Sequence, residues 1–310
     1  MPSRKATWNG YAILALIPAS FACSFLLPYG WISAPIFLAI IIHQLILREI
    51  FKGPKYRSPV FSDPEWELIN LKNKGFDVYG FINWQPHDAD LVVFVHGWQS
   101  SSEKYVERMS IFKDKKMHTL AIDMRGHGIA PATSEWTAAK VISDIKYVLE
   151  SLDESRINKI HFYGHSLGAF VCVGMHHPRH SGWWKDRYGT LILESPMIAY
   201  SPIMEEMAPT RFILPLLKKW SVKGFIRIHP EFRGLKWGDI DIPNWGLPSC
   251  PTLVLQASND TRLGRIHYDL LMDQSIDIEA HLIKSLPHSG NRTNSERDNL
   301  ISEWIENKFI

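Results

Sequence analysis

Short apolar runs alternate with helical segments along most of this chain, and that alternation limits the possible folds more than any other feature. The runs are rich in β-branched and aromatic residues and are bounded by turn residues, as β-strands are. Their central members are almost continuously apolar, which is typical of strands covered on both faces. The pattern predicts an α/β fold with a mostly parallel central sheet and helices on both faces. The expected strands are residues 66–71 and 76–83, as a hairpin, then 91–97, 118–124, 159–165, 190–195, 251–258 and 278–284.

Helical periods fill most of the intervals between these strands. One long interval, residues 197–249, breaks the alternation because it is amphipathic and rich in Trp, Phe and Ile. We expect it to form a helical cap over the carboxyl edge of the sheet, where open α/β folds bind ligands. Its segments 212–220 and 222–232 combine apolar and basic residues, which fits an interfacial helix or a lid packed on the sheet. The expected helices of the sheet domain are 103–115, 137–151, 166–177, 262–273 and 294–309.

Charge is distributed unevenly along the 310 residues. The net charge is +2, but residues 1–57 contain six Lys or Arg and one Glu, so the remaining residues carry 28 basic and 31 acidic side chains. This slightly acidic body lacks the basic face that binds a phosphate backbone, so no nucleic acid is expected as a partner. Cys23, Cys172 and Cys250 show no C-x-x-C spacing, which favours neither a disulfide framework nor a zinc site.

The N-terminal segment has no formal charge between residues 6 and 47 and is mostly apolar. One membrane-spanning helix needs about 20 apolar residues, so this segment is about twice that length. Pro28-Tyr29-Gly30 near its middle is a turn sequence, and we therefore expect two transmembrane helices. A single long signal anchor and a cleaved signal peptide are the alternatives.

Basic residues flank both outer ends of this segment, which favours two cytoplasmic ends. The Pro-rich, basic residues 50–64 would then form a linker along an anionic membrane surface. The sequence thus predicts two domains. Residues 1–57 form a membrane anchor with its linker, and residues 58–310 form the α/β domain with a cap at about 197–249.

The motif Gly164-His165-Ser166-Leu167-Gly168 follows one expected strand and precedes a helical run. Its two glycines permit the tight strand-turn-helix that exposes a serine at the end of a sheet, and the helix N-terminus presents N–H groups to an anion. A serine hydroxyl becomes a strong nucleophile only when a base removes its proton and an acid orients that base. Ser166 is therefore the candidate nucleophile.

Candidates for the acid and the base follow in later loops. Asp260 comes directly after the expected strand 251–258, and His288 comes after the strand 278–284. Chain order and position at strand ends suit a triad with Ser166. Glu194, at the end of an earlier strand, remains an alternative acid.

A developing oxyanion needs two backbone donors near the nucleophile. The N–H of Leu167, directly after Ser166, is one candidate. The other is the N–H of Trp98, in the His96-Gly97-Trp98 loop that follows the apolar run LVVFV (91–95).

At these motifs the chain resembles the serine hydrolases of the α/β-hydrolase superfamily. It is similar to the bacterial lysophospholipase, monoacylglycerol lipase and serine aminopeptidase-like group. The resemblance covers about residues 65–310, although the HGGG form of the oxyanion loop is absent. It rests on motifs in the order that the family uses, which are HGW (96–98), DMRGHG (123–128), GHSLG (164–168), SND (258–260) and PHSG (287–290).

The resemblance implies an α/β-hydrolase fold with Ser166, Asp260 and His288 as the catalytic triad. Trp98 and Leu167 would form the oxyanion hole, and the reaction would need no metal and no organic cofactor. DMRGHG resembles a turn that is structural in the family, so no catalytic role is expected for its side chains.

The expected function is a membrane-anchored serine hydrolase that cleaves carboxylic esters through an acyl-enzyme. Lysophospholipids or monoacylglycerols are the expected substrates, because the N-terminal segment and the cap are apolar. The expected location is the inner membrane of a bacterium, with the catalytic domain in the cytoplasm. A peptidase or thioesterase of the same fold, and a non-catalytic binding module, are alternatives. For the peptidase, Glu205-Glu206 is a candidate site for a free amino terminus.

A cluster of histidines, His176, His177 and His180, invites a metal assignment. No carboxylate or cysteine stands nearby at ligand spacing, and Pro178 breaks the helix that would align the rings. We therefore expect a helix end at this cluster.

Overall fold

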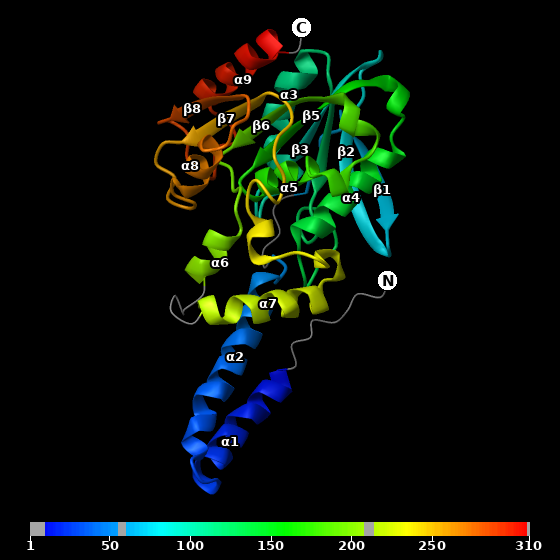
Figure 1. Cartoon of the computed structure of the whole chain (residues 1–310). Coiled ribbons are helices and arrows are strands. Elements are labelled where there is room, and N and C mark those ends of the chain that lie inside the picture. Colours follow the sequence, from blue (N-terminus) through cyan, green and yellow to red (C-terminus); the bar gives the residue numbers. More distant parts are fainter. Residues whose placement is uncertain (1–9, 55–59, 208–213, 309–310) are drawn as a thin grey trace. The chain divides into compact units, whose positions relative to one another are not determined.

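A computed structural model describes residues 10–54, 60–207 and 214–308 (Figure 1). All eight expected strands are present in one sheet. The first two form an antiparallel hairpin, and the second of them pairs antiparallel with the strand His118–Asp123. That strand and the other five are mutually parallel. The predicted mostly parallel α/β sheet is therefore confirmed. The spatial order is β1 (Glu67–Asn73), β2 (Phe76–Asn83), β4 (His118–Asp123), β3 (Ala89–Val95), β5 (Ile157–His165), β6 (Tyr188–Glu194), β7 (Thr252–Ala257) and β8 (Ile278–Ile283).

Helices cover both faces of this sheet (Figure 1). On one face α3 (Val106–Asp114) contacts α9 (Ser295–Lys308), and on the other α4 (Ala138–Ser151) contacts α5 (Leu167–Met175). α8 (Ile266–Met272) starts four residues later than expected, because the residues after Asp260 form a turn around its carboxylate.

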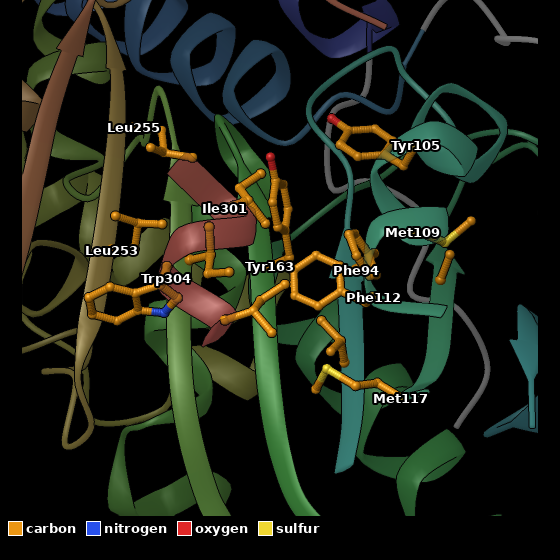
Figure 2. Packing of buried hydrophobic residues seen from close by; sticks show 14 of the residues in the cluster. Phe94, Tyr105, Met109, Phe112, Met117, Tyr163, Leu253, Leu255, Ile301 and Trp304 are labelled. Carbon is orange, nitrogen blue, oxygen red and sulfur yellow. The ribbon is translucent and has the colours of Figure 1, made fainter. Parts of the chain in front are cut away.

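A cluster of buried side chains fills the space between the sheet and the α3–α9 face (Figure 2). Phe94 of β3 lies between Tyr163 of β5 and Phe112 of α3, with ring centroids 5.0 and 5.4 Å away. Trp304 and Ile301 of α9 belong to the same cluster. Burying a side chain of this size stabilises a fold by about 1.5–3 kcal/mol, so the cluster holds the strands rigidly and fixes where their carboxyl ends lie.

Contacts divide the chain into two compact units. The first contains the described residues up to Lys52 together with Ser201–Trp237, and the second contains Gly53–Tyr200 and Gly238–Ile310. The first unit comprises α1 (Gly10–Leu26), α2 (Ser33–Ile50), α6 (Ser201–Met207) and α7 (Leu214–Ile228). Most of the stretch expected as a cap, Ser201–Trp237, therefore groups with the N-terminal helices.

Aromatic packing between α2 and α7 holds the first unit together. His43 stacks on Trp220 with ring centroids 3.7 Å apart. Phe51, just after α2, contacts the rings of Phe225 at 4.9 Å and Phe232 at 5.5 Å. The N-terminal segment thus supplies part of the core that the insertion needs.

The membrane prediction requires correction. In the part of the chain that the structure describes, no helix is both long and apolar enough to cross a membrane. α1 has 17 residues, about 26 Å of helix against a hydrocarbon core of about 30 Å. α2 has 18 residues, but Arg48 and Glu49 fall in its last turn. The transmembrane hairpin therefore has no support, and the predicted bacterial inner-membrane location is wrong.

The orientation of that hairpin was inferred from flanking charges. Four of these charged residues, Arg4, Lys5, Lys55 and Arg57, lie outside the described residues.

Candidate active site

Ser166 stands in a sharp turn between β5 and α5 with φ 52° and ψ −118°, a conformation that side chains rarely adopt. The flanking glycines make this turn possible. A Cβ on Gly164 would lie 2.6 Å from the Cα of Ala169, and one on Gly168 would lie 2.0 Å from the carbonyl oxygen of Val95. The two glycines of the motif are therefore required by close backbone approach.

Backbone hydrogen bonds hold this strained turn on both sides. The N–H of Ser166 donates to the carbonyl of Glu194 at 3.0 Å. The carbonyl of Ser166 accepts from the N–H groups of Ala169, at 3.0 Å, and Met197, at 3.1 Å. The backbone N–H and carbonyl of Ser166 are thus both hydrogen-bonded, and these bonds fix the turn that presents its side chain.

Ser166, His288 and Asp260 form one hydrogen-bonded chain. Nε2 of His288 lies 3.0 Å from Oγ of Ser166, and Nδ1 of His288 lies 2.7 Å from Oδ2 of Asp260. The structure therefore brings together the three side chains that the sequence predicted as a triad. All three come from loops at the carboxyl ends of strands β5, β7 and β8.

The Asp260 carboxylate is held ionised. Burial alone would raise its pKa, but the hydrogen bonds from His288 and from the N–H groups of Leu263 and Arg262 outweigh this and lower the pKa to about 2. The two backbone donors lie 2.9 Å from Oδ1, and the side-chain amide of Gln256 donates to Oδ2 at 3.2 Å.

The ionised carboxylate determines which nitrogen of His288 carries the proton. A carboxylate only accepts hydrogen bonds, so Nδ1 of His288 must donate to Asp260. The lone pair of Nε2 then faces the hydroxyl of Ser166 and can accept its proton.

Glu194, the alternative acid, makes other contacts. Its carboxylate is fully buried and forms an ion pair with Arg108, whose Nε lies 3.0 Å from Oε2. It also accepts hydrogen bonds from the hydroxyl of Tyr163 and the amide of Asn291. The sequence contained no sign of these partners, which lie far away along the chain.

The two candidate oxyanion donors flank Ser166. The N–H of Leu167 is the first of α5, and that of Trp98 follows β3; among the described residues neither has a hydrogen-bond partner. The Trp98 loop approaches the nucleophile closely, since a Cβ on Gly97 would lie 3.3 Å from the Cβ of Ser166 and 2.8 Å from Nδ1 of His165. Two open N–H groups beside the serine suit a developing oxyanion.

The DMRGHG turn supports this loop. Nε2 of His96 accepts from the N–H of Met124 at 3.1 Å, and its Nδ1 lies 2.8 Å from the carbonyl of Gly97. Burial lowers the pKa of His96 to about 4, so the ring is neutral at pH 7. The carboxylate of Asp123 accepts from the N–H groups of Ser102 and Ile129, which closes the turn.

The histidine cluster lies at a helix end. His176 caps α5 and stacks on Tyr188 at 4.3 Å. Throughout the described residues, no group of three or more His, Cys, Asp or Glu side chains is arranged to hold a metal ion.

Fold and geometry together define an α/β hydrolase with a serine in its nucleophile turn. Residues 86–243, just over half of the chain, match the family described as serine aminopeptidase, S33. The chain belongs to this family, and the resemblance found in the sequence motifs is confirmed.

Curated relatives match shorter stretches. A non-heme chloroperoxidase of Burkholderia pyrrocinia is 36% identical over 87 residues, which are 28% of this chain and 30% of that protein. A bifunctional esterase/perhydrolase of Acinetobacter calcoaceticus is 32% identical over 97 residues, 30% of this chain and 33% of that protein. The matched part thus spans only 30% and 33% of these two relatives.

Solved structures share the fold over most of the chain. An esterase of Pyrococcus furiosus superposes with a TM-score of 0.58 at 17% identity, covering 82% of this chain and 100% of that one. A soluble variant of the monoglyceride lipase of Saccharomyces cerevisiae gives 0.57 at 17% identity, covering 81% and 99%. Identities this low establish the shared fold alone.

Proposed function

We propose that this protein is a serine hydrolase that cleaves carboxylic esters through an acyl-enzyme on Ser166. The observation that carries the proposal is the continuous chain from Oγ of Ser166 through His288 to Asp260, with steps of 3.0 and 2.7 Å. The family match and the esterase and lipase folds among the similar structures support it.

In the first half-reaction, Oγ of Ser166 attacks the ester carbonyl while Nε2 of His288 takes the hydroxyl proton. Asp260 stabilises the imidazolium that forms. The N–H groups of Leu167 and Trp98 bind the oxyanion of the tetrahedral intermediate. His288 then gives its proton to the leaving alcohol oxygen as the carbon–oxygen bond breaks, which leaves the acyl-enzyme.

In the second half-reaction, His288 takes a proton from water, and the resulting nucleophile attacks the acyl carbonyl. The same two amides bind the second oxyanion. Collapse of this intermediate returns the proton to Oγ of Ser166 and releases the carboxylic acid.

The proposed substrates are monoacylglycerols or lysophospholipids. Two observations support an acyl chain: the insertion between β6 and β7 is rich in apolar side chains, and one protein of the same fold is a monoglyceride lipase. p-Nitrophenyl esters of increasing chain length test this. We expect kcat/KM to rise from acetate to octanoate or longer, and a profile that falls from acetate onward would contradict a lipid substrate.

The family description favours one second candidate, an aminopeptidase. Such an enzyme needs an acidic group for the free amino terminus, but Glu205 is already paired with Lys218 at 2.7 Å. The side chain of Glu206 lies outside those that the structure describes. Rates on aminoacyl-nitroanilides, p-nitrophenyl esters and acyl thioesters distinguish an aminopeptidase, an esterase and a thioesterase. We expect the p-nitrophenyl esters to be cleaved fastest.

A fluorescent fluorophosphonate tests the nucleophile directly. The purified wild-type chain should become labelled, and Ser166→Ala should not, while both give the same circular dichroism spectrum. If a folded wild-type chain is not labelled, the serine is not activated, and the binding-module alternative replaces the proposal.

A further inference from the structure

The loop that carries His288 is held to the body of the enzyme by buried groups. It runs from the end of β8 to the start of α9 and includes Gly290 at φ 80°, a backbone conformation that favours glycine. The Ser166–His288 contact depends on where this loop lies. The contacts that fix it therefore bear on the geometry of the triad.

Asn291, three residues after His288, is bound by three buried side chains. Its carbonyl oxygen accepts from Nη2 of Arg108 at 2.6 Å and from Nη1 of Arg297 at 2.7 Å. Its side-chain amide donates to Oε1 of Glu194. Both arginines are almost completely buried, and Glu194 has no exposed surface.

The number of N–H donors in the cluster of Glu194, Arg108 and Arg297 explains why this cluster binds the His288 loop. Two guanidinium groups offer up to ten N–H donors. The carboxylates of Glu194 and Asp298 accept some of them, and the remaining donors need other acceptors. The Asn291 carbonyl takes two of the surplus donors. If the loop moved away, these buried donors would lose their acceptor, which is energetically costly.

Glu194 holds both partners of the Ser166–His288 contact at once. Its backbone carbonyl accepts the N–H of Ser166 at 3.0 Å, and its side chain binds Asn291 of the His288 loop. Burial alone would raise the pKa of Glu194. This effect is outweighed by the interactions with Arg108, His165, Arg297 and Tyr163, which lower the pKa to about 2. The carboxylate thus stays ionised throughout the range in which a hydrolase works.

The same cluster also reaches the oxyanion loop. The guanidinium of Arg108 lies 4.6 Å from the ring centroid of Tyr105, and the hydroxyl of Tyr105 accepts the N–H of Gly97 at 3.4 Å. Gly97 directly precedes Trp98. The nucleophile turn, the His288 loop and the oxyanion loop are therefore joined through one buried ion pair.

We propose that Glu194, paired with Arg108 and Arg297, is a positioning residue that sets the distance between Ser166 and His288. The inference rests on the proposed hydrolase function. Glu194 touches no reacting atom, so its loss should lower the rate of acylation and leave substrate binding unchanged.

Glu194→Gln tests the proposal, with Asp144→Asn as the matched control. Asp144 is also a buried carboxylate, bound by Arg125 at 2.6 and 2.8 Å and by Asn73 of the edge strand β1, at the opposite end of the sheet from β8. Both variants replace an arginine-bound carboxylate with an amide. With p-nitrophenyl butyrate we expect Glu194→Gln to lower kcat by about 10²-fold with KM unchanged. Asp144→Asn should keep kcat while losing a comparable amount of thermal stability.

Hydrogen exchange supplies a second measurement. Amides of residues 285–294 should exchange faster in Glu194→Gln than in the wild type and in Asp144→Asn. If both variants lose kcat equally, or if Glu194→Gln retains wild-type kcat, the positioning role is overturned.

A milder pair within the His288 loop decides the question if Glu194→Gln does not fold. Asn291→Ala removes the side-chain donor to Glu194, and Arg292→Ala removes exposed ion pairs with Glu103 and Glu107. We expect Asn291→Ala to lower kcat by about tenfold and Arg292→Ala to leave it unchanged. Equal kcat values in the two variants would overturn the proposal. Failure of fluorophosphonate to label the wild type would instead overturn the hydrolase function itself.

Discussion

Nε2 of His165 lies 2.7 Å from the backbone carbonyl oxygen of His288, so the residue before the nucleophile contacts the backbone of the base. Burial lowers the pKa of His165 to about 4, although Glu194 favours its charged form. The ring is neutral at pH 7, and because a carbonyl only accepts, its single proton is on Nε2. His165 therefore serves the triad as a neutral donor.

Acid should destabilise the fold in two stages. His96 and His165, each with a pKa of about 4 in the folded chain, stay neutral while the unfolded chain binds protons below its ordinary value of 6.5. Glu194, with a pKa of about 2 against an ordinary 4.5, stays ionised while the unfolded chain becomes protonated. In both cases the unfolded state binds more protons, so stability is lost as pH falls.

Urea unfolding at several pH values measures this loss. The free energy of unfolding should fall between pH 6.5 and about 4 through the histidines, and further below about pH 4.5 through Glu194, which contributes about 3 kcal/mol. Glu194→Gln should keep the first stage and lose the part of the second that Glu194 contributes, while Asp260, whose pKa is also lowered to about 2, keeps the remainder. Identical pH dependence in the variant and the wild type would contradict the assignment.

Asp260→Asn should reduce kcat by about 10³–10⁴-fold, because the amide no longer enforces the tautomer of His288 that faces Ser166. KM should change little. Steady-state kinetics with p-nitrophenyl butyrate measure the effect. A loss smaller than about tenfold would mean that Asp260 does not orient the base.

Gly97→Ala should impair catalysis through the oxyanion loop. The new Cβ would lie 2.8 Å from Nδ1 of His165, so the loop must shift and carry the N–H of Trp98 with it. Loss of one oxyanion donor costs about 10²–10³-fold in kcat. Gly238→Ala is the control, since a Cβ there has no neighbour within 4 Å. Comparable kcat in the two variants would show that the loop tolerates the methyl group.

Phe51→Ala should loosen the first compact unit. Phe51 is 8% exposed and contacts Phe225, His229 and Phe232, so the cavity should cost about 3 kcal/mol. Faster hydrogen exchange in α7 would report this loss. Phe25→Ala provides the control, because Phe25 is 81% exposed. Unchanged exchange in Phe51→Ala would mean that α7 does not depend on the N-terminal segment.

Local patterns predicted the parts of the molecule that local chemistry determines. Apolar runs rich in β-branched residues predicted the strands. Ser166 stands in a turn whose two glycines are required, because any larger residue there would clash with the backbone. Asp260 and His288 were predictable as triad candidates because each follows a strand end. Their roles stay predictions until the variants are measured.

Features that depend on distant contacts were missed. Arg108 and Arg297 flank Glu194 only after folding, and nothing in their own neighbourhoods marks them as buried. The N-terminal segment was misinterpreted because apolarity alone does not determine whether a helix spans a membrane. Large apolar side chains of α1 and α2 are exposed, such as Phe21 at 63% and Ile36 at 58%. The structure packs α2 against α7, and its helices are shorter than the apolar segment that contains them.

The packing of Phe51 on Phe225 joins residues 174 positions apart in the chain. At a synthesis rate of about 5–20 residues per second, Phe51 is synthesised about 9–35 s before Phe225. During that interval α1 can already contact α2, but the side of α2 that packs on α7 has no native partner. The first unit can therefore be completed only after most strands of the sheet have been translated.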